Sequence, residues 1–252
     1  MLHYTQYGQG QPIIILHGLL GSSENWKTIA QHLGEYFDVY TLDLRNHGMS
    51  FHHSDMTYHD MATDVIELVN HYHLYNPIII GHSMGGKVAI SVAKQIEAQL
   101  HKLIIVDIIN KKYDNRHLDI LNVMEDIAFG EFNSLSTLNI ALEKDIPNPQ
   151  LRGFILKNII RKAIPFKWKV NIPAIKNNYH HISGPIPLDT PLEIPTLIIR
   201  GEHSDYITDT DIKTLHTTFE TVQVDTIPNT GHWIHVESPK PFLNTVFNFI
   251  LE

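Results

Sequence analysis

Apolar runs that are mostly continuous recur along the chain, centred near Ile13, Tyr40, Ile79, Ile105 and Ile198. Such runs are typical of parallel strands whose two faces are both covered, whereas a half-exposed strand alternates apolar and polar residues. Segments with helical spacing separate the runs, at residues 23–33, 57–72, 87–99, 209–219 and 239–251. The pattern predicts an α/β fold with a mostly parallel central sheet and helices on both faces.

The alternation of strand and helix stops between Asp107 and Pro195. This stretch shows helical patterns near residues 118–129, 134–143 and 150–164, followed by proline-rich connections. We therefore expect a core formed by residues 1–107 and 190–252, interrupted by a helical cap at residues 108–189. A cap in this place would cover the carboxyl ends of the strands, where open α/β sheets bind ligands.

The expected cap supplies candidates for the walls of a substrate pocket, which are Phe154, Ile155, Ile159 and Trp168. Packing of the cap against the sheet explains these residues equally well. The cap is also locally basic within an acidic chain, through Lys157, Arg161, Lys162, Lys167 and Lys169. These cations would attract the phosphates of coenzyme A if they face the pocket, and would otherwise form a solvated face.

A buried apolar run leads into Gly81-His82-Ser83-Met84-Gly85 and then into a helical pattern. Gly-x-Ser-x-Gly between a strand and a helix is typical of a nucleophile elbow, where a sharp turn exposes the serine and glycines let neighbouring backbone approach. The five-residue pattern alone is common, so the strand before it and the helix after it carry the prediction. Ser83 is the candidate nucleophile.

A nucleophilic serine needs a general base, and His232 follows a strand-like run at residues 222–227. The chain has 18 histidines, so position rather than residue type favours His232. We expect the neighbouring Trp233 to lie at the substrate pocket.

The oxyanion of acyl transfer is usually met by two backbone amides, one after the nucleophile and one in the loop after an early strand. Met84 and Leu19 occupy these two positions. His17 and Gly18 begin the early loop and are expected at the pocket, with the His17 ring bracing the loop rather than reacting.

A catalytic triad also needs an acidic residue that orients the histidine, and the spacing of residues along the chain does not decide which carboxylate this is. In such folds the acid usually stands three residues after the glycine that ends the strand near Ile198, but that residue is Ser204, and Asp205 follows it. Asp107 instead ends the strand near Ile105, which should lie beside the Ser83 strand. We favour Asp107, with Ser204 as a hydrogen-bond partner of the same imidazole, and keep Asp205 as the alternative acid.

Five motifs together resemble one known family: His17-Gly18, Asp43-x-Arg45-Asn46-His47-Gly48-x-Ser50, Gly81-His82-Ser83-Met84-Gly85-Gly86-Lys87, Val106-Asp107-Ile108 and Gly231-His232-Trp233. The chain resembles the α/β-hydrolase fold and, within it, the bacterial YbfF-type esterases and acyl-CoA thioesterases. The resemblance spans nearly the whole chain. It implies that Asp107 is the acid, although Asp205 stands where that branch typically has none.

The expected activity is hydrolysis of short- to medium-chain carboxylic esters or acyl-CoA thioesters through an acyl-enzyme, without a cofactor. Two alternatives stay open. One is a lyase of the menaquinone pathway on the same fold, against which Arg45-Asn46-His47-Gly48 counts. The other is a slowly hydrolysing sensor that acts by binding a partner.

Composition narrows the function classes further. The net charge of −8 argues against nucleic-acid binding, and the chain has no cysteine for disulfides. The histidine pairs lack further ligands at zinc-site spacing, so no metal is expected. Residues 1–8 do not resemble a signal peptide, and no apolar run reaches the ~18 residues of a membrane span. We expect a cytoplasmic enzyme with a small-molecule acyl substrate, and the oligomeric state cannot be read from the sequence.

Overall fold

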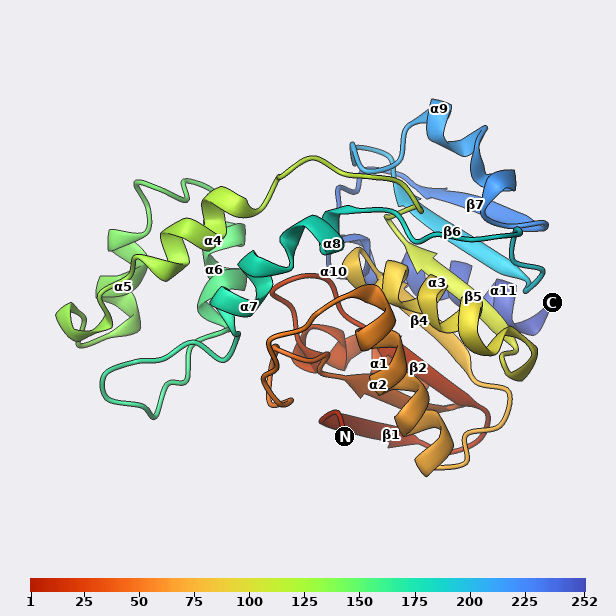
Figure 1. Ribbon diagram of the computed structural model, residues 1–252, viewed down its shortest axis with the longest axis horizontal. Helices are drawn as coiled ribbons and strands as arrows, with labels where there is room; N and C mark the ends of the chain where they lie inside the picture. The colour runs from red at the N-terminus through yellow and green to blue at the C-terminus, as the bar shows by residue number, and fades with distance from the viewer.

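A computed structural model describes all residues, 1–252. A seven-stranded sheet in the order β1-β3-β2-β4-β5-β6-β7 forms its centre (Figure 1). The strands are β1 (Tyr4–Gly8), β2 (Pro12–Leu16), β3 (Asp38–Leu42), β4 (Ile78–His82), β5 (Lys102–Val106), β6 (Thr196–Gly201) and β7 (Val222–Ile227). All neighbours pair in parallel except β1, which pairs antiparallel with β3. The predicted α/β-hydrolase architecture is confirmed.

The continuous apolar runs are explained by burial on both faces of the sheet. Along β2, Ile13 and Ile15 join a cluster with α1 (Lys27–Leu33) and α11 (Pro239–Leu251). Ile14 and Leu16 point the other way and join the cluster that contains α2 (Tyr58–His71) and α3 (Met84–Ile96). Successive side chains of a strand face opposite sides, so a strand between two helical layers is apolar at every position.

Smaller elements complete the core: α9 (Asp209–Ile212), α10 (Ile234–Glu237) and the 3-10 turns η1 (Ser23–Trp26), η2 (Glu97–Gln99) and η4 (Leu215–Thr217). The helix expected at residues 209–219 is thus a short α-helix followed by a separate 3-10 turn. The apolar pattern did not predict β1, whose residues Tyr4-Thr5-Gln6-Tyr7-Gly8 are half-buried or exposed.

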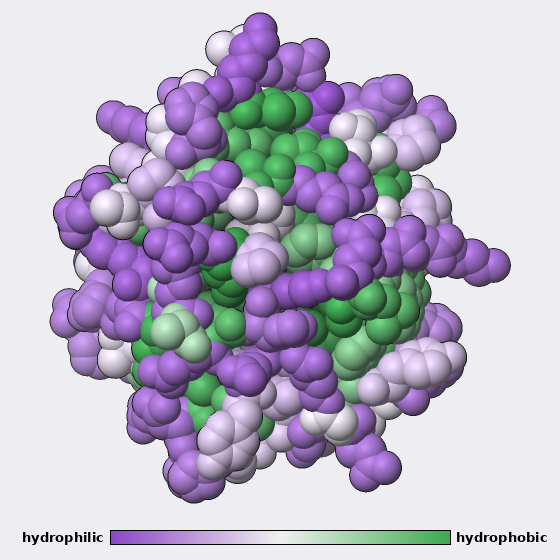
Figure 2. Space-filling model, turned by 90° about the vertical axis from the view of Figure 1, so that its right-hand side faces the viewer, coloured by the Kyte–Doolittle hydropathy of each residue, from purple (hydrophilic) through white to green (hydrophobic).

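No strand of the sheet lies between Val106 and Thr196, and we call residues 108–194 the inserted segment. It contains α4 (Leu118–Glu125), η3 (Phe129–Glu131), α5 (Leu135–Ala141), α6 (Pro149–Leu156), α7 (Ile172–Asn177) and α8 (Tyr179–Ser183). Helices α4 to α7 lie beside the sheet rather than over its faces (Figure 1). At the opposite end of the molecule hydrophilic residues cover most of the surface (Figure 2).

The helix predicted at residues 150–164 ends earlier than expected. Asn148 caps α6 and Pro149 begins it, but the helix stops at Leu156. The chain then turns back on itself, with an isolated antiparallel bridge between Ile159 and Trp168. Two helices, α7 and α8, occupy the region where the sequence suggested proline-rich connections.

We predict that Gly81→Ala lowers the free energy of unfolding by at least about 2 kcal/mol, because overpacking a rigid site is costly. A Cβ on Gly81 would lie 2.3 Å from the carbonyl oxygen of Gly85. The control is Gly153→Ala in α6, where no atom lies within 4 Å of the added Cβ. That variant should gain up to about 1 kcal/mol of helix stability. Urea unfolding measures both, and equal stabilities would contradict the prediction.

Candidate active site

Ser83 stands at the turn between β4 and α3. Its backbone has φ 51° and ψ −121°, a conformation that non-glycine residues rarely adopt. A Cβ on Gly85 would lie 2.4 Å from the carbonyl oxygen of Leu16, so the start of α3 sits directly on the end of β2. Only glycine permits this approach, and it presents the serine at the carboxyl ends of the parallel strands.

The loop after β2 lies against this turn. A Cβ on Gly18 would be 3.2 Å from the Cβ of Ser83, so the two segments touch at this position. The amide of Leu19 donates no hydrogen bond within the protein. Met84 is the first residue of α3, where backbone amides lack intrahelical acceptors. Two unpaired donors are therefore available close to the Ser83 hydroxyl.

Two buried histidines hold the loop in place. His17 accepts from the amide of Leu44 at Nε2 (3.0 Å), and its Nδ1 lies 2.8 Å from the carbonyl oxygen of Gly18. His47 accepts from the amide of Leu20 at Nε2 (3.1 Å), and its Nδ1 lies 3.0 Å from the carbonyl oxygen of Arg45. Both patterns fit a neutral ring protonated at Nδ1. Burial lowers the pKa of His17 and lowers that of His47 to about 3.

Both ring nitrogens of His17 are thus engaged by backbone, in agreement with a bracing role. The sequence named His47 only as part of a motif and missed its structural task.

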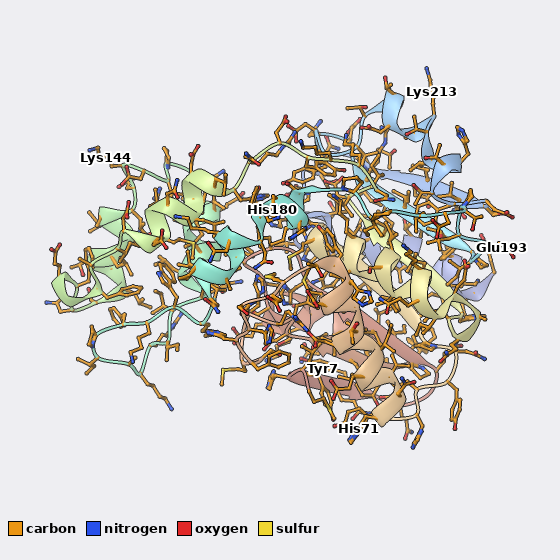
Figure 3. All side chains as sticks on the ribbon, viewed as in Figure 1. Tyr7, His71, Lys144, His180, Glu193 and Lys213 are labelled. Atoms are coloured by element: carbon orange, nitrogen blue, oxygen red, sulfur yellow. The ribbon has the colours of Figure 1, made fainter.

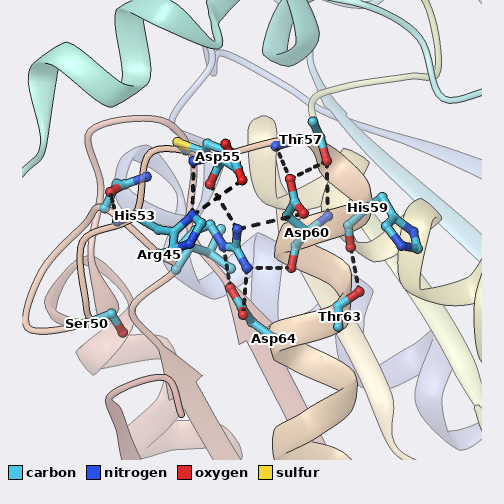
Figure 4. A network of polar contacts seen from close by, with 12 residues as sticks. Arg45, Ser50, His53, Asp55, Thr57, His59, Asp60, Thr63 and Asp64 are labelled. Carbon is cyan, nitrogen blue, oxygen red and sulfur yellow. Dashed lines mark hydrogen bonds and ion pairs between the residues drawn. The ribbon is translucent and has the colours of Figure 1, made fainter.

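Arg45 anchors the segment that carries His47. Its guanidinium makes a two-pronged contact with Asp64 of α2, at 2.6 Å and 2.8 Å, and also donates to the carbonyl oxygens of Asp55 and Asp60 (Figure 4). The Arg45 side chain is almost completely buried. A buried arginine needs all of these acceptors, so the contact fixes the loop after β3 to α2.

Asp107 follows β5 and has no exposed surface. Its Oδ2 lies 2.7 Å from Nδ1 of His232 and also accepts from the hydroxyl of Ser204. Its Oδ1 accepts from the amide of Gly201 at 3.1 Å. Burial raises the pKa of Asp107 to about 7, and the Ser204 and Gly201 hydrogen bonds act in the opposite direction. Burial lowers the pKa of the His232 imidazole, so it is neutral at pH 7 and able to accept a proton.

The expectation that Ser204 bonds the imidazole was wrong. Its hydroxyl donates to the carboxylate of Asp107 instead, and Asp107 in turn contacts the imidazole. The structure brings Asp107, His232 and Ser204 together from the ends of β5, β7 and β6.

Asp205 lies outside the hydrogen-bond network of Asp107, Ser204 and His232. Its carboxylate pairs with Arg116 at 2.6 Å, and its side chain is 76% exposed. Arg116 in turn lies over the ring of Tyr206, 4.8 Å from the centroid. Tyr206 stacks on His232, with 3.7 Å between ring centroids and 12° between planes. The sequence missed both Arg116 and Tyr206, because no motif marks a stacking partner.

Ser83 and His232 line one cavity of about 400 Å³. The expected residues His17, Gly18, Leu19, Phe154 and Trp233 also line it. Phe154 and Trp233 face each other with 5.8 Å between ring centroids. Met84 instead lines a smaller cavity of about 40 Å³, which Ser83 and Leu19 share. Ile120, Leu151 and Val236 are further apolar wall residues that the sequence did not identify.

Three of the expected pocket walls are absent from the cavity lining. Ile155 and Ile159 are buried in the hydrophobic cluster that the inserted segment shares with the core. Trp168 packs on Phe129 and donates from Nε1 to the carbonyl oxygen of Met124 at 2.9 Å. Consecutive residues of a helix point about 100° apart, so Phe154 of α6 faces the cavity while Ile155 faces the interior.

The structure contains no cluster of three or more histidine, cysteine or acidic side chains arranged to hold a metal ion. None of its helices combines the length and apolarity needed to cross a bilayer.

The chain is similar to esterases and lipases over nearly its whole length. A family model described as alpha/beta hydrolase fold matches residues 11–133. The sn-1-specific diacylglycerol lipase ABHD11 of Danio rerio is 32% identical, over 96% of this chain and 79% of that protein. Esterase YbfF of Escherichia coli is 27% identical, over 95% and 92%. A solved structure described as a marine microorganism esterase has 41% identity and a TM-score of 0.95, covering 98% of both chains.

We predict that Ser204→Ala moves the acidic limb of the pH profile of kcat/KM to higher pH. The Ser204 hydrogen bond lowers the pKa of Asp107, so its loss raises that pKa and lets the dyad with His232 take up a proton at higher pH. At pH values above this limb, kcat/KM of the variant should be lower than that of the wild type by less than about tenfold, which corresponds to the net free energy of one hydrogen bond. Ser204→Thr keeps a hydroxyl and should shift the limb less. An unchanged limb in Ser204→Ala would refute the assigned contact.

Proposed function

The chain belongs to the α/β-hydrolase family of esterases and lipases, and we propose that Ser83, His232 and Asp107 form the catalytic triad of a carboxylic ester hydrolase. The observation that carries the proposal is the 2.7 Å contact between Asp107 and His232, at the cavity that Ser83 also lines. Convergence of an elbow serine, a neutral imidazole and a buried carboxylate is the arrangement that nucleophilic acyl transfer requires.

The proposed reaction has two steps. His232 accepts the proton of Ser83 at Nε2 as the hydroxyl oxygen attacks the ester carbonyl. The amides of Leu19 and Met84 bind the developing oxyanion. His232 then protonates the leaving alcohol or thiol, and an acyl-enzyme remains on Ser83. Water activated by His232 attacks the acyl-enzyme and releases the carboxylic acid, so no cofactor takes part.

Asp107 has two tasks in this scheme. It holds the imidazole with Nε2 directed toward the reaction, and it stabilises the imidazolium formed in each step. Ser204 supports the carboxylate through its hydroxyl. Asp205 is not the acid in this proposal, because its carboxylate is exposed and paired with Arg116.

We assign residues 108–189 the role of a cap over the cavity. Helix α6 contributes Leu151 and Phe154 to the cavity lining, opposite Trp233, and Lys157 at the end of the helix also lines the cavity. A largely apolar cavity of about 400 Å³ suits acyl chains of short to medium length, as esters or as acyl-CoA thioesters. The relatives named as diacylglycerol lipases make glycerol esters a further substrate class to include in assays.

We predict that Ser83→Ala retains the fold and loses about 10⁵-fold or more in kcat, because no nucleophile remains. The measurement is steady-state hydrolysis of p-nitrophenyl esters from acetate to palmitate, beside matched acyl-CoA thioesters. The preferred chain length would size the cavity. Rapid turnover by a correctly folded Ser83→Ala would overturn the proposed nucleophile. Negligible turnover by the wild type on every substrate would favour the lyase or the sensor.

We predict that Asp107→Asn lowers kcat by about 10⁴-fold, because an amide cannot hold the same tautomer or stabilise the imidazolium. Asp205→Asn is the matched control, since it makes the same chemical change one residue after Ser204. Its effect on kcat should stay within about threefold, as expected for an exposed ion pair. The assay is hydrolysis of the best ester of the series, and the reverse order of effects would assign the acid to Asp205.

A further inference from the structure

Residues 146–188 contain no acidic residue, although the chain as a whole has 27. The same stretch holds seven cationic side chains, which are Arg152, Lys157, Arg161, Lys162, Lys167, Lys169 and Lys176. The chain carries a net charge of −8, so the rest of the molecule is even more acidic. Positive charge is therefore concentrated in one part of the inserted segment.

Three of these cations are neutralised within the protein. Arg152, Lys169 and Lys176 each pair with a glutamate, which is Glu143, Glu24 or Glu125. The other four are Lys157, Arg161, Lys162 and Lys167. Each of these four is exposed, and none forms an ion pair. Because nothing within the chain offsets them, they can bind an external anion.

Three of the four unpaired cations lie on a hairpin. The amide of Ile160 donates to the carbonyl oxygen of Lys167 (2.8 Å), and the amide of Lys169 donates to that of Asn158 (2.7 Å). Residues 160–167 form the turn of this hairpin, which we call the hairpin tip. In Figures 1 and 3 this loop between α6 and α7 projects from the body of the molecule, with side chains extending outward.

The hairpin tip also presents apolar surface. Ile164 is 99% exposed, more than any other large apolar residue of the chain, and Ile160 is 39% exposed. The aromatic residues of the hairpin are engaged instead, because Phe166 and Trp168 both pack on Phe129. The tip therefore offers an aliphatic side chain surrounded by cations and no free aromatic ring.

We propose that the hairpin tip docks on anionic phospholipid surfaces. Arg161, Lys162 and Lys167 would bind the headgroup phosphates, while Ile164 enters the acyl boundary. A nucleic acid is disfavoured as the occupant, because it would leave the isoleucine in water and find no aromatic side chain for base stacking. The acidic remainder of the molecule is repelled by the same surface, which fixes the orientation of docking.

The base of the hairpin adjoins the cavity. Asn158, at the base of the hairpin, donates to the carbonyl oxygen of Leu20 in the loop beside Ser83. Lys157, one residue before it, lines the cavity. Binding to the lipid surface is a separate property from hydrolysis, so the docking proposal does not depend on the proposed triad.

The test is co-sedimentation with vesicles of ether-linked phosphatidylcholine and phosphatidylglycerol, which an esterase cannot cleave. We expect wild-type binding that increases with the phosphatidylglycerol fraction and weakens with salt. Arg161→Gln/Lys162→Gln/Lys167→Gln should weaken it by at least tenfold, since each cation near such a surface contributes about fivefold. Ile164→Ser should weaken it by about threefold or more, with the charge unchanged.

Matched controls separate the hairpin from general effects of charge and hydrophobicity. Lys112→Gln/Lys213→Gln/Lys240→Gln removes three exposed lysines outside the hairpin, of which Lys213 lies across the molecule from Lys144, between α5 and α6 (Figure 3). Ile140→Ser removes another exposed isoleucine, 65% exposed, from α5. Both controls should bind like wild type, and turnover of p-nitrophenyl acetate should be the same in all variants.

Three results would overturn the proposal. The first is that the wild type does not bind phosphatidylglycerol vesicles. The second is that the hairpin triple and the control triple lose the same affinity for the vesicles. The third is that Ile164→Ser binds the vesicles as tightly as the wild type does. Tight binding to duplex DNA that is lost in the hairpin triple but kept in Ile164→Ser would assign the cations to a nucleic acid instead.

Discussion

The buried carboxylate of Asp107 ties the site to the sheet. It stands at the end of β5 and receives hydrogen bonds from Gly201, the last residue of β6, and from Ser204 and His232, which follow β6 and β7. A carboxylate without exposed surface is costly unless every oxygen is satisfied. The parallel pairing of β5 with β6 and of β6 with β7 brings the three strand ends close enough to do so. The position of His232 therefore depends on the register of the sheet as much as on its own loop.

Neutral histidines form much of the framework around this carboxylate. His82 contacts the carbonyl oxygen of His232 through Nε2 at 2.9 Å, and burial lowers the pKa of both rings. His235 is stacked on Trp26, with 4.0 Å between centroids, and burial also lowers its pKa. An imidazole can donate at one nitrogen and accept at the other while uncharged, so His17 and His47 link backbone segments without a buried charge. His235 contributes by packing instead, because its buried Nδ1 has no hydrogen-bond partner. These uses account for several of the histidines that composition alone left unexplained.

The sequence predicted those parts of the molecule in which burial or backbone conformation restricts the type of residue. Strands between two helical layers read as apolar runs, and the Ser83 elbow needs glycines at fixed positions, so both were recognisable. The edge strand β1 has no such apolar pattern, because its side chains are only partly buried. The choice between Asp107 and Asp205 could not be made from spacing, since it depends on which strand ends meet. Ile155 and Phe154 are alike in type, and only the turn at which α6 begins determines which of them faces the cavity.

The inserted segment and the core jointly hold one residue beside the nucleophile. The carbonyl oxygen of Leu20 accepts from Asn158 of the segment, and its amide donates to His47 of the core. Leu20 has φ 59°, which is unfavourable for a leucine and persists only while the surroundings enforce it. If the segment moved away, the carbonyl would be released, Leu20 could relax, and the neighbouring amide of Leu19 would change direction. The placement of the inserted segment and the alignment of the proposed oxyanion donor therefore both depend on the backbone of a single residue.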